Sequence, residues 1–150
     1  MTKIVLLENI RSLHNVGSLL RTADGAGWDK VFLCGYTGCP PDRRIEKVSL
    51  GAENFISWEH VDSALEVCKK LKNEGFEIIA LEQTAKSENI FEAKFLEKNM
   101  ALILGNEVDG VTKEVLDFSD RHLEIPMHGK KSSLNVAVAG GVAMYVIDLL

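Results

Sequence analysis

The chain has 150 residues and a net charge of −5, with 46% hydrophobic and 26% charged residues, a composition typical of one globular domain. No apolar run approaches the ~20 residues that span a membrane, and the short apolar N-terminus has no signal-peptide pattern, so we expect a cytoplasmic protein. The acidic balance argues against a dedicated nucleic-acid-binding domain, although an enzyme acting on RNA needs only a local basic patch.

Five short apolar runs predict β-strands, and segments with helical periodicity lie between and after them. The strands are expected at Lys3–Glu8, Lys30–Gly35, Phe76–Glu82, Met100–Gly105 and His122–Met127, and the helices over Val16–Ala26, Val61–Leu71 and Leu134–Leu149. The strands are almost continuously apolar, as is typical of strands covered on both faces. This alternation predicts an α/β fold with a mostly parallel sheet and helices on both faces.

Three cysteines, Cys34, Cys39 and Cys68, occur without a Cys-x-x-Cys pair. An odd number without that spacing predicts neither a disulfide framework nor a zinc site. Cys34 and Cys68 fall within apolar patterns, so we interpret them as small core residues.

A first candidate segment, 15–23, opens the first predicted helix. Asn15 stands where an N-cap residue belongs, and His14, Ser18 and Arg21 form one polar stripe on the helix. An arginine on this helix is expected to point toward the carboxyl edge of the sheet, where open α/β folds bind ligands. The alternative is a cap followed by a solvent-facing arginine.

A second segment, 102–111, runs from a buried strand into Gly105-Asn106-Glu107 and then Asp109-Gly110. The glycines permit a tight turn and the close approach of a ligand, and Glu107 is an acid at the end of a strand. The alternative is an ordinary strand-to-helix turn.

A third segment, 125–139, passes from a strand through a loop into the last helix, which Ser132 or Ser133 could cap. Free N–H groups at such a helix start suit a carboxylate or a phosphate. Gly140-Gly141 inside the helix costs about 1 kcal/mol per glycine relative to alanine. Close packing against another backbone, within the chain or across a dimer, would offset that cost.

Taken in this order, the three segments resemble the SpoU/TrmH family of RNA 2′-O-methyltransferases. The resemblance covers essentially the whole chain and implies a single catalytic domain, residues 1–150, with no appended RNA-binding domain. It implies the SPOUT fold, a mostly parallel sheet of five or six strands with a C-terminal deep trefoil knot. General folding rules would not predict a knot. It also implies a homodimer with each active site near the subunit interface.

The resemblance further assigns roles to individual residues. S-adenosylmethionine would contact Leu81, Gly105, Ile125, Met127, Ser133 and Leu134. The matching catalytic residues are Asn15, Arg21, Glu107 and Asn135, with Ser133 nearby. Ala137 stands where relatives often carry a hydroxyl.

The expected reaction is methyl transfer to a ribose 2′-hydroxyl, which requires no metal. Arg21 would either bind a phosphate through its planar fork or act as the base, and its neutral form costs roughly 7 kcal/mol at pH 7. Glu107 is expected to orient Arg21 or Asn15. The basic side chains expected to contact RNA, besides Arg21, are Arg43, Arg44, Lys47, Lys130 and Lys131.

We expect tRNA as the substrate by analogy. The alternatives are an rRNA methyltransferase and a non-catalytic relative that binds RNA or the donor. A Rossmann-type enzyme is a weaker interpretation, because neither G-x-G-x-x-G nor a P-loop motif follows any strand. The arginine-rich loop at 35–44 could also be a plain solvated loop.

Overall fold

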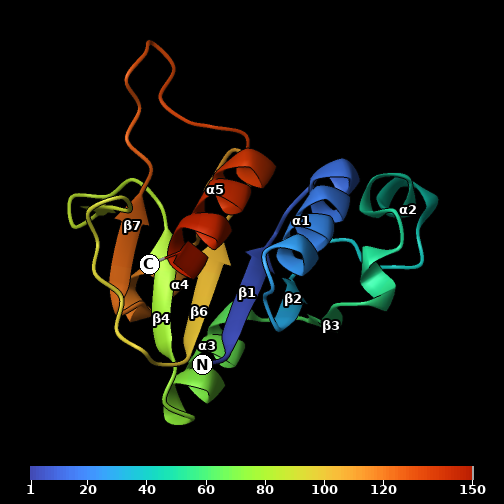
Figure 1. Cartoon of the computed structure of the whole chain (residues 1–150), viewed down its shortest axis with the longest axis horizontal. Helices are drawn as coiled ribbons and strands as arrows, with labels where there is room; N and C mark the ends of the chain where they lie inside the picture. Colours follow the sequence, from blue (N-terminus) through green and yellow to red (C-terminus); the bar gives the residue numbers. More distant parts are fainter. Residues whose placement is uncertain (150) are drawn as a thin grey trace.

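The computed structural model describes residues 1–149 (Figure 1). Its elements are, in chain order, β1 (Lys3–Glu8), α1 (Leu13–Gly25), β2 (Lys30–Cys34), α2 (Arg43–Ser49), the 3-10 helix η1 (Ala52–Asn54), β3 (Ser57–Val61), α3 (Ala64–Asn73), β4 (Glu77–Leu81), β5 (Glu88–Asn89), β6 (Met100–Leu104), α4 (Lys113–Phe118), β7 (Arg121–Glu124) and α5 (Val136–Leu149).

The strands form one parallel sheet in the order β3-β2-β1-β6-β4-β7-β5. β1 lies inside the sheet, where Val5 is in register with Val31 of β2 and Leu102 of β6. All pairings are parallel, so the predicted α/β class with its parallel sheet is confirmed. The expected five or six strands were too few, because the sheet has seven.

The two additional strands are the edges of the sheet. β3 contains exposed Glu59 and His60, so it lacks the apolar run that marks a covered strand, and β5 has only two residues. The helix expected from Val61 is shorter than predicted: Val61 ends β3, and α3 begins after Ser63, whose side chain accepts a hydrogen bond from the Glu66 N–H at 3.2 Å. The predicted helix therefore included Val61, which is the last residue of the edge strand β3.

Side chains alternate between the two faces of the sheet, and each face has its own core. In β6, Leu102 and Leu104 join the core beneath α1 and α5, whereas Ala101 and Ile103 join the core beneath α3 and α4. Figure 1 shows α1 and α5 in front of the strands. This arrangement confirms helices on both faces and explains why the central strands are continuously apolar.

The helix α5 packs against α1 through a glycine. A Cβ at Gly140 would lie 2.6 Å from both a Leu104 and a Leu19 methyl carbon, whereas at Gly141 the nearest atom would be a Thr22 methyl carbon at 3.5 Å. Packing within the chain therefore accounts for Gly140, although its neighbours are leucine side chains and not the expected backbone. Gly141 has room for a side chain in the monomer.

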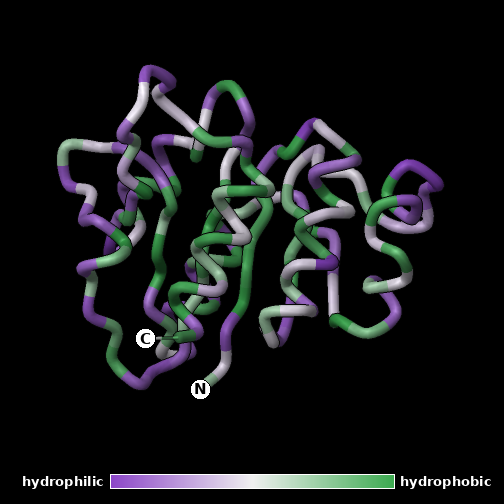
Figure 2. The backbone as a smooth tube through the Cα atoms, turned by 45° about the horizontal axis from the view of Figure 1, so that its top comes forward, coloured by the Kyte–Doolittle hydropathy of each residue, from purple (hydrophilic) through white to green (hydrophobic). Residues whose placement is uncertain are grey.

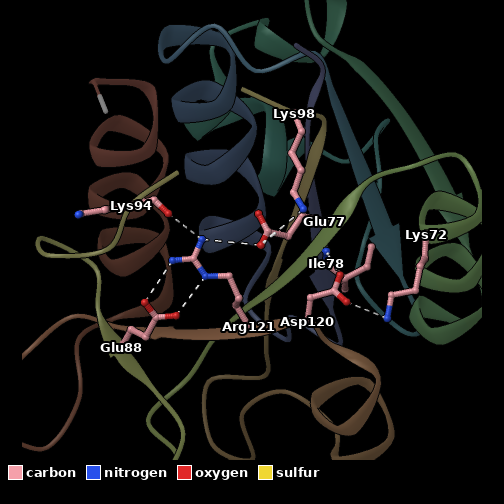
Figure 3. Close-up of polar contacts among 8 residues, drawn as sticks. All are labelled: Lys72, Glu77, Ile78, Glu88, Lys94, Lys98, Asp120 and Arg121. Atoms are coloured by element: carbon pink, nitrogen blue, oxygen red, sulfur yellow. Dashed lines mark hydrogen bonds and ion pairs between the residues drawn. The ribbon is translucent and has the colours of Figure 1, made fainter. Parts of the chain in front are cut away.

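Ion pairs gather at the amino end of the sheet, where its strands begin (Figure 3). The Arg121 guanidinium contacts Glu77 at 3.7 Å and Glu88 at 3.1 Å, and donates to the Lys94 carbonyl at 3.0 Å. Asp120 accepts from the Ile78 N–H at 2.8 Å and pairs with Lys72 at 3.0 Å. These contacts tie segment 88–94 to the start of β7.

Hydrophobic residues run along the central strands and α5, and hydrophilic residues predominate in the surrounding loops (Figure 2). Cys34 and Cys68 are fully buried, which confirms their interpretation as core residues. Burial raises the pKa of both thiols, that of Cys68 to about 12. None of the helices within residues 1–149 is long and apolar enough to cross a membrane.

Candidate active site

The carboxyl ends of β4, β6 and β7, with the loop that leads into α5, surround a cavity of about 530 Å³. This is the edge at which open parallel α/β sheets bind ligands. The six positions that the sequence assigned to a methyl donor all line this cavity: Leu81, Gly105, Ile125, Met127, Ser133 and Leu134. Residues from three separate strands thus meet around one space of small-molecule size.

A tight turn after β6 forms one wall of the cavity. The N–H of Asn106 donates to the Gly110 carbonyl at 3.1 Å, and the reverse bond measures 2.9 Å. The Asn106 side chain accepts from the N–H groups of Val108 and Asp109, both at 2.8 Å. A Cβ at Gly105 would lie 2.2 Å from the Val111 nitrogen, so only glycine fits where the turn closes.

Glu107 projects from this turn to the start of α1. Its Oε1 accepts from the Arg11 N–H at 2.9 Å, and its Oε2 accepts from the Ser12 N–H at 2.9 Å and from the Asn15 side-chain amide at 3.1 Å. Partial burial raises the pKa of Glu107, but these hydrogen bonds outweigh burial, so its pKa lies below the usual glutamate value. Glu107 is therefore an anion at neutral pH and a poor general base.

Asn15 connects Glu107 to the third motif. The Asn15 Oδ1 accepts from the Asn135 side-chain amide at 3.3 Å, while its amide nitrogen donates to Glu107. Both ends of this buried amide are therefore fixed. One chain of hydrogen bonds, Glu107–Asn15–Asn135, unites the three sequence motifs.

Two predicted helix caps were assigned to the wrong residues. The N-cap of α1 is Ser12, whose side chain accepts from the Asn15 N–H at 3.1 Å, so Asn15 lies in the first turn. For α5, the side chain of Asn135 accepts from the Ala137 and Val138 N–H groups at 2.8 and 3.3 Å, so neither Ser132 nor Ser133 is the cap. Each helix begins at a different residue from the one expected, and this frees Asn15 to reach Glu107.

Arg21 lies outside this network. It is exposed on α1, six residues beyond Asn15, which is about 9 Å along the helix axis. Within residues 1–149, no hydrogen bond or ion pair to its side chain is formed. α1 runs away from the carboxyl edge of the sheet, and the expected contact of Arg21 with a ligand at that edge stays a prediction. Glu107 was expected to orient either Arg21 or Asn15, and in the structure its carboxylate accepts a hydrogen bond from Asn15.

The expected RNA contacts occupy two separate exposed regions. Arg43, Arg44 and Lys47 are exposed on α2, but the Arg44 guanidinium pairs with Asp42 at 3.0 Å. Lys130 and Lys131 are exposed in the loop between β7 and α5. The first region lies beyond α1, and the second lies next to the cavity.

Sequence reasoning missed several polar residues at the cavity. The Glu82 carboxylate accepts from the Val111 N–H at 3.0 Å, and the Gln83 amide donates to the Ser132 carbonyl at 2.7 Å, which ties the end of β4 to the loop before α5. Asp109 and Glu124 also line the cavity. Glu82 and Glu124 fall inside the predicted strands 76–82 and 122–127. Gln83 and Asp109 come shortly after predicted strands, so polar residues near the carboxyl ends of strands were the available signal.

Comparisons with known proteins identify the family. The chain matches the SpoU rRNA methylase family over residues 2–145, and it belongs to that family. It is 33% identical over 143 residues to the tRNA (guanosine(18)-2′-O)-methyltransferase of Aquifex aeolicus, covering 95% of this chain and 66% of the relative.

Two solved structures extend the likeness. The AdoMet-bound rRNA methyltransferase of Sinorhizobium meliloti has a TM-score of 0.88 at 25% identity, covering 97% of this chain and 55% of that one. A structure addressing the 2-OH methylation of C/U34 on tRNA has a TM-score of 0.78 at 28% identity, covering 96% and 92%. The chain spans 57 to 66% of the length of the curated relatives it matches.

Proposed function

We propose that the protein transfers a methyl group from S-adenosylmethionine to a ribose 2′-hydroxyl of RNA. The observation that carries this proposal is the Glu107–Asn15–Asn135 chain beside a cavity lined by all six expected donor positions. Relatives named as 2′-O-methyltransferases support the reaction, and the AdoMet-bound Sinorhizobium enzyme supports the donor. Within the described residues, no group of His, Cys, Asp or Glu side chains is arranged to hold a metal ion.

The charge of the cavity fits this donor. Its lining includes the carboxylates of Glu82, Glu107, Asp109 and Glu124, and among the described lining residues there is no lysine, arginine or histidine. Such a wall attracts a ligand of net positive charge. The donor carries a sulfonium, an ammonium and one carboxylate, and when bound it supplies an already activated methyl group. We therefore assign donor contacts to Leu81, Gly105, Ile125, Met127, Ser133 and Leu134.

The hydrogen-bonded chain would position the acceptor. Glu107 stays ionised and fixes the Asn15 amide, which in turn fixes Asn135 next to the donor positions. Such positioning of two reacting centres provides much of the catalysis when one centre is already activated. Ser133 lines the same cavity and can orient the 2′-hydroxyl.

We further propose that the active enzyme is a homodimer. On α5, the side chains of Val138, Tyr145 and Leu149 are apolar and between 47 and 82% exposed, and Gly141 leaves space beside Thr22 of α1. An apolar helix face of this kind favours burial against a second copy. Arg21 is exposed on the adjacent α1, so dimerisation along this face would bring it toward a partner's cavity, where it would bind an RNA phosphate.

Among RNA substrates we favour tRNA, with rRNA as the alternative, because two of the relatives described above are named for tRNA. Arg43, Arg44, Lys47, Lys130 and Lys131 would contact its backbone. We also propose that the protein acts in the cytoplasm, because relatives are named for tRNA. A single catalytic domain over residues 1–150 and a C-terminal trefoil knot stay predictions from the family resemblance.

The test is methyl transfer from labelled S-adenosylmethionine to total tRNA and, separately, to ribosomal RNA, with Arg21→Ala as the comparison. We expect label in one pool and its loss in the variant, with donor affinity retained. Donor binding without transfer to either pool would favour a non-catalytic relative. Absence of donor binding would contradict the proposal.

A further inference from the structure

The loop after β2 presents an aromatic ring that the proposed reaction has not used. Tyr36 is 60% exposed, yet its position is fixed at both ends. Its hydroxyl accepts a hydrogen bond from the Asn106 side-chain amide at 2.7 Å, and its N–H donates to the Asn9 side chain at 3.2 Å. An exposed side chain held in this way has already lost much of its rotational freedom.

The loop that carries Tyr36 is itself rigidly attached to the sheet. The Thr37 hydroxyl donates to the Leu7 carbonyl at 3.0 Å and accepts from the Ile10 N–H at 3.0 Å. The His60 ring contacts the Gly35 carbonyl at 2.9 Å. The neighbours on both sides of Tyr36 are thus bonded to β1 or β3, so the ring forms a preorganised surface.

This ring lies at the turn that forms the candidate active site. Asn106, which holds the tyrosine hydroxyl, and Glu107, which holds Asn15, are consecutive residues, and both line the cavity. The same turn binds the backbone of Arg11, which is exposed and whose side chain forms no ion pair within the described residues. An open aromatic face and a free cation therefore flank one turn.

We infer that Tyr36 is a stacking surface for an RNA base at or beside the methylated nucleotide, with Arg11 contacting the adjacent phosphate. Aromatic side chains stack on bases of any sequence, and arginine is suited to phosphate. The inference rests on the proposed function for the identity of the ligand. Other large aromatic side chains are also exposed, such as Phe55 at 81%, but Phe55 lies after η1 and is not part of this turn.

The experiment compares Tyr36→Leu, Tyr36→Phe and the control Phe55→Leu. Retention of total tRNA on nitrocellulose gives the RNA Kd, the labelled-methyl assay separates KM for RNA from kcat, and titration with S-adenosylmethionine gives the donor Kd. We expect Tyr36→Leu to weaken RNA binding and raise KM about tenfold, with donor Kd unchanged. Tyr36→Phe keeps the ring but frees it from Asn106, so its effect should be two- to threefold by the same stacking argument.

Several outcomes would overturn the inference. Equal losses in Tyr36→Leu and Tyr36→Phe would assign Tyr36 only to the support of Asn106. An effect as large in Phe55→Leu, no effect in Tyr36→Leu, a change in donor Kd or a changed oligomeric state in gel filtration would also contradict base stacking. If the wild-type protein retains tRNA through Tyr36 but transfers no methyl group, the proposed function fails while the stacking surface stands.

Discussion

The two ends of the parallel sheet use charge in opposite ways. At the amino end, opposite charges meet: Arg121 contacts Glu77 and Glu88, and Asp120 contacts Lys72. At the carboxyl end, Glu107 is held by neutral N–H donors, and its negative charge is not cancelled. Paired charges hold segments of the chain together, whereas an uncancelled field is available to a ligand. The first end is structural and the second is the candidate active site.

The largest expected effect comes from removing the charge that organises the carboxyl end. In Glu107→Gln, one side-chain oxygen can still accept hydrogen bonds, but the new NH2 group faces a backbone or side-chain donor. Asn15 then loses its fixed orientation, and we expect kcat for methyl transfer to fall about 100-fold. Glu92→Gln is the charge-matched control, because Glu92 is exposed and remote from the network. Equal activity of the two variants would contradict the role of the Glu107–Asn15–Asn135 chain.

At the amino end, the expected loss is in stability. Arg121→Ala leaves Glu77, whose side chain is only 11% exposed, without this partner. We expect the free energy of unfolding to fall by about 2–3 kcal/mol, less than for a fully buried pair because Glu88 is half exposed. Urea denaturation would measure this loss. Lys113→Ala is the control and should show no measurable change, since the Lys113–Asp117 pair is exposed. A similar loss in both variants would mean that the Arg121 ion pairs contribute no more to the free energy of unfolding than an exposed pair.

The glycine pair on α5 separates packing inside the chain from packing outside it. Gly140→Ala forces a methyl group against Leu19 and Leu104, so we expect a destabilisation of about 1–3 kcal/mol. Gly141→Ala makes an ordinary contact with Thr22 in the monomer, and its better helix propensity should raise stability by up to about 1 kcal/mol. Thermal unfolding measures both. A weakened dimer in Gly141→Ala, seen by analytical ultracentrifugation, would place this glycine at the subunit interface.

The smallest expected effect is a dependence on pH. The folded-state pKa of Glu107 lies below its ordinary value of 4.5. Its contribution to stability is therefore fully present above that value and is lost as the pH falls through the folded-state pKa. The stability difference between wild type and Glu107→Gln should shrink only below about pH 4.5. A difference that shrinks between pH 6 and 8 would mean that Glu107 titrates near neutrality.

Much of this could be predicted from the sequence, and the residues explain why. Leu102, Ile103 and Leu104 are all buried, although they point to opposite faces of the sheet. The continuous run of hydrophobic residues therefore predicted β6. β3, with exposed Glu59 and His60, gave no such signal. The six donor positions line one cavity because they lie at or beyond the carboxyl ends of three neighbouring strands, β6, β4 and β7.

The details of the site depend on three-dimensional contacts that a linear pattern does not contain. Glu107 reaches Asn15 across 92 residues, and Asn135 reaches it across 120. The identity of the α1 cap depends on these long-range contacts. The Asn15 side chain is bonded to Glu107, and Ser12 caps the helix instead. Tyr36 was overlooked for the same reason: its significance comes from Asn106, 70 residues away.

The central claim is that the carboxyl end of this sheet directs a methyl group to a ribose 2′-oxygen, and alkaline hydrolysis of the labelled RNA tests it most directly. A 2′-O-methyl group blocks cleavage of the adjacent phosphodiester bond, because hydrolysis needs the free 2′-hydroxyl. We predict that the label is recovered in alkali-resistant dinucleotides and that Glu107→Gln reduces it. Label recovered in mononucleotides would mean methylation of a base, and would contradict the account.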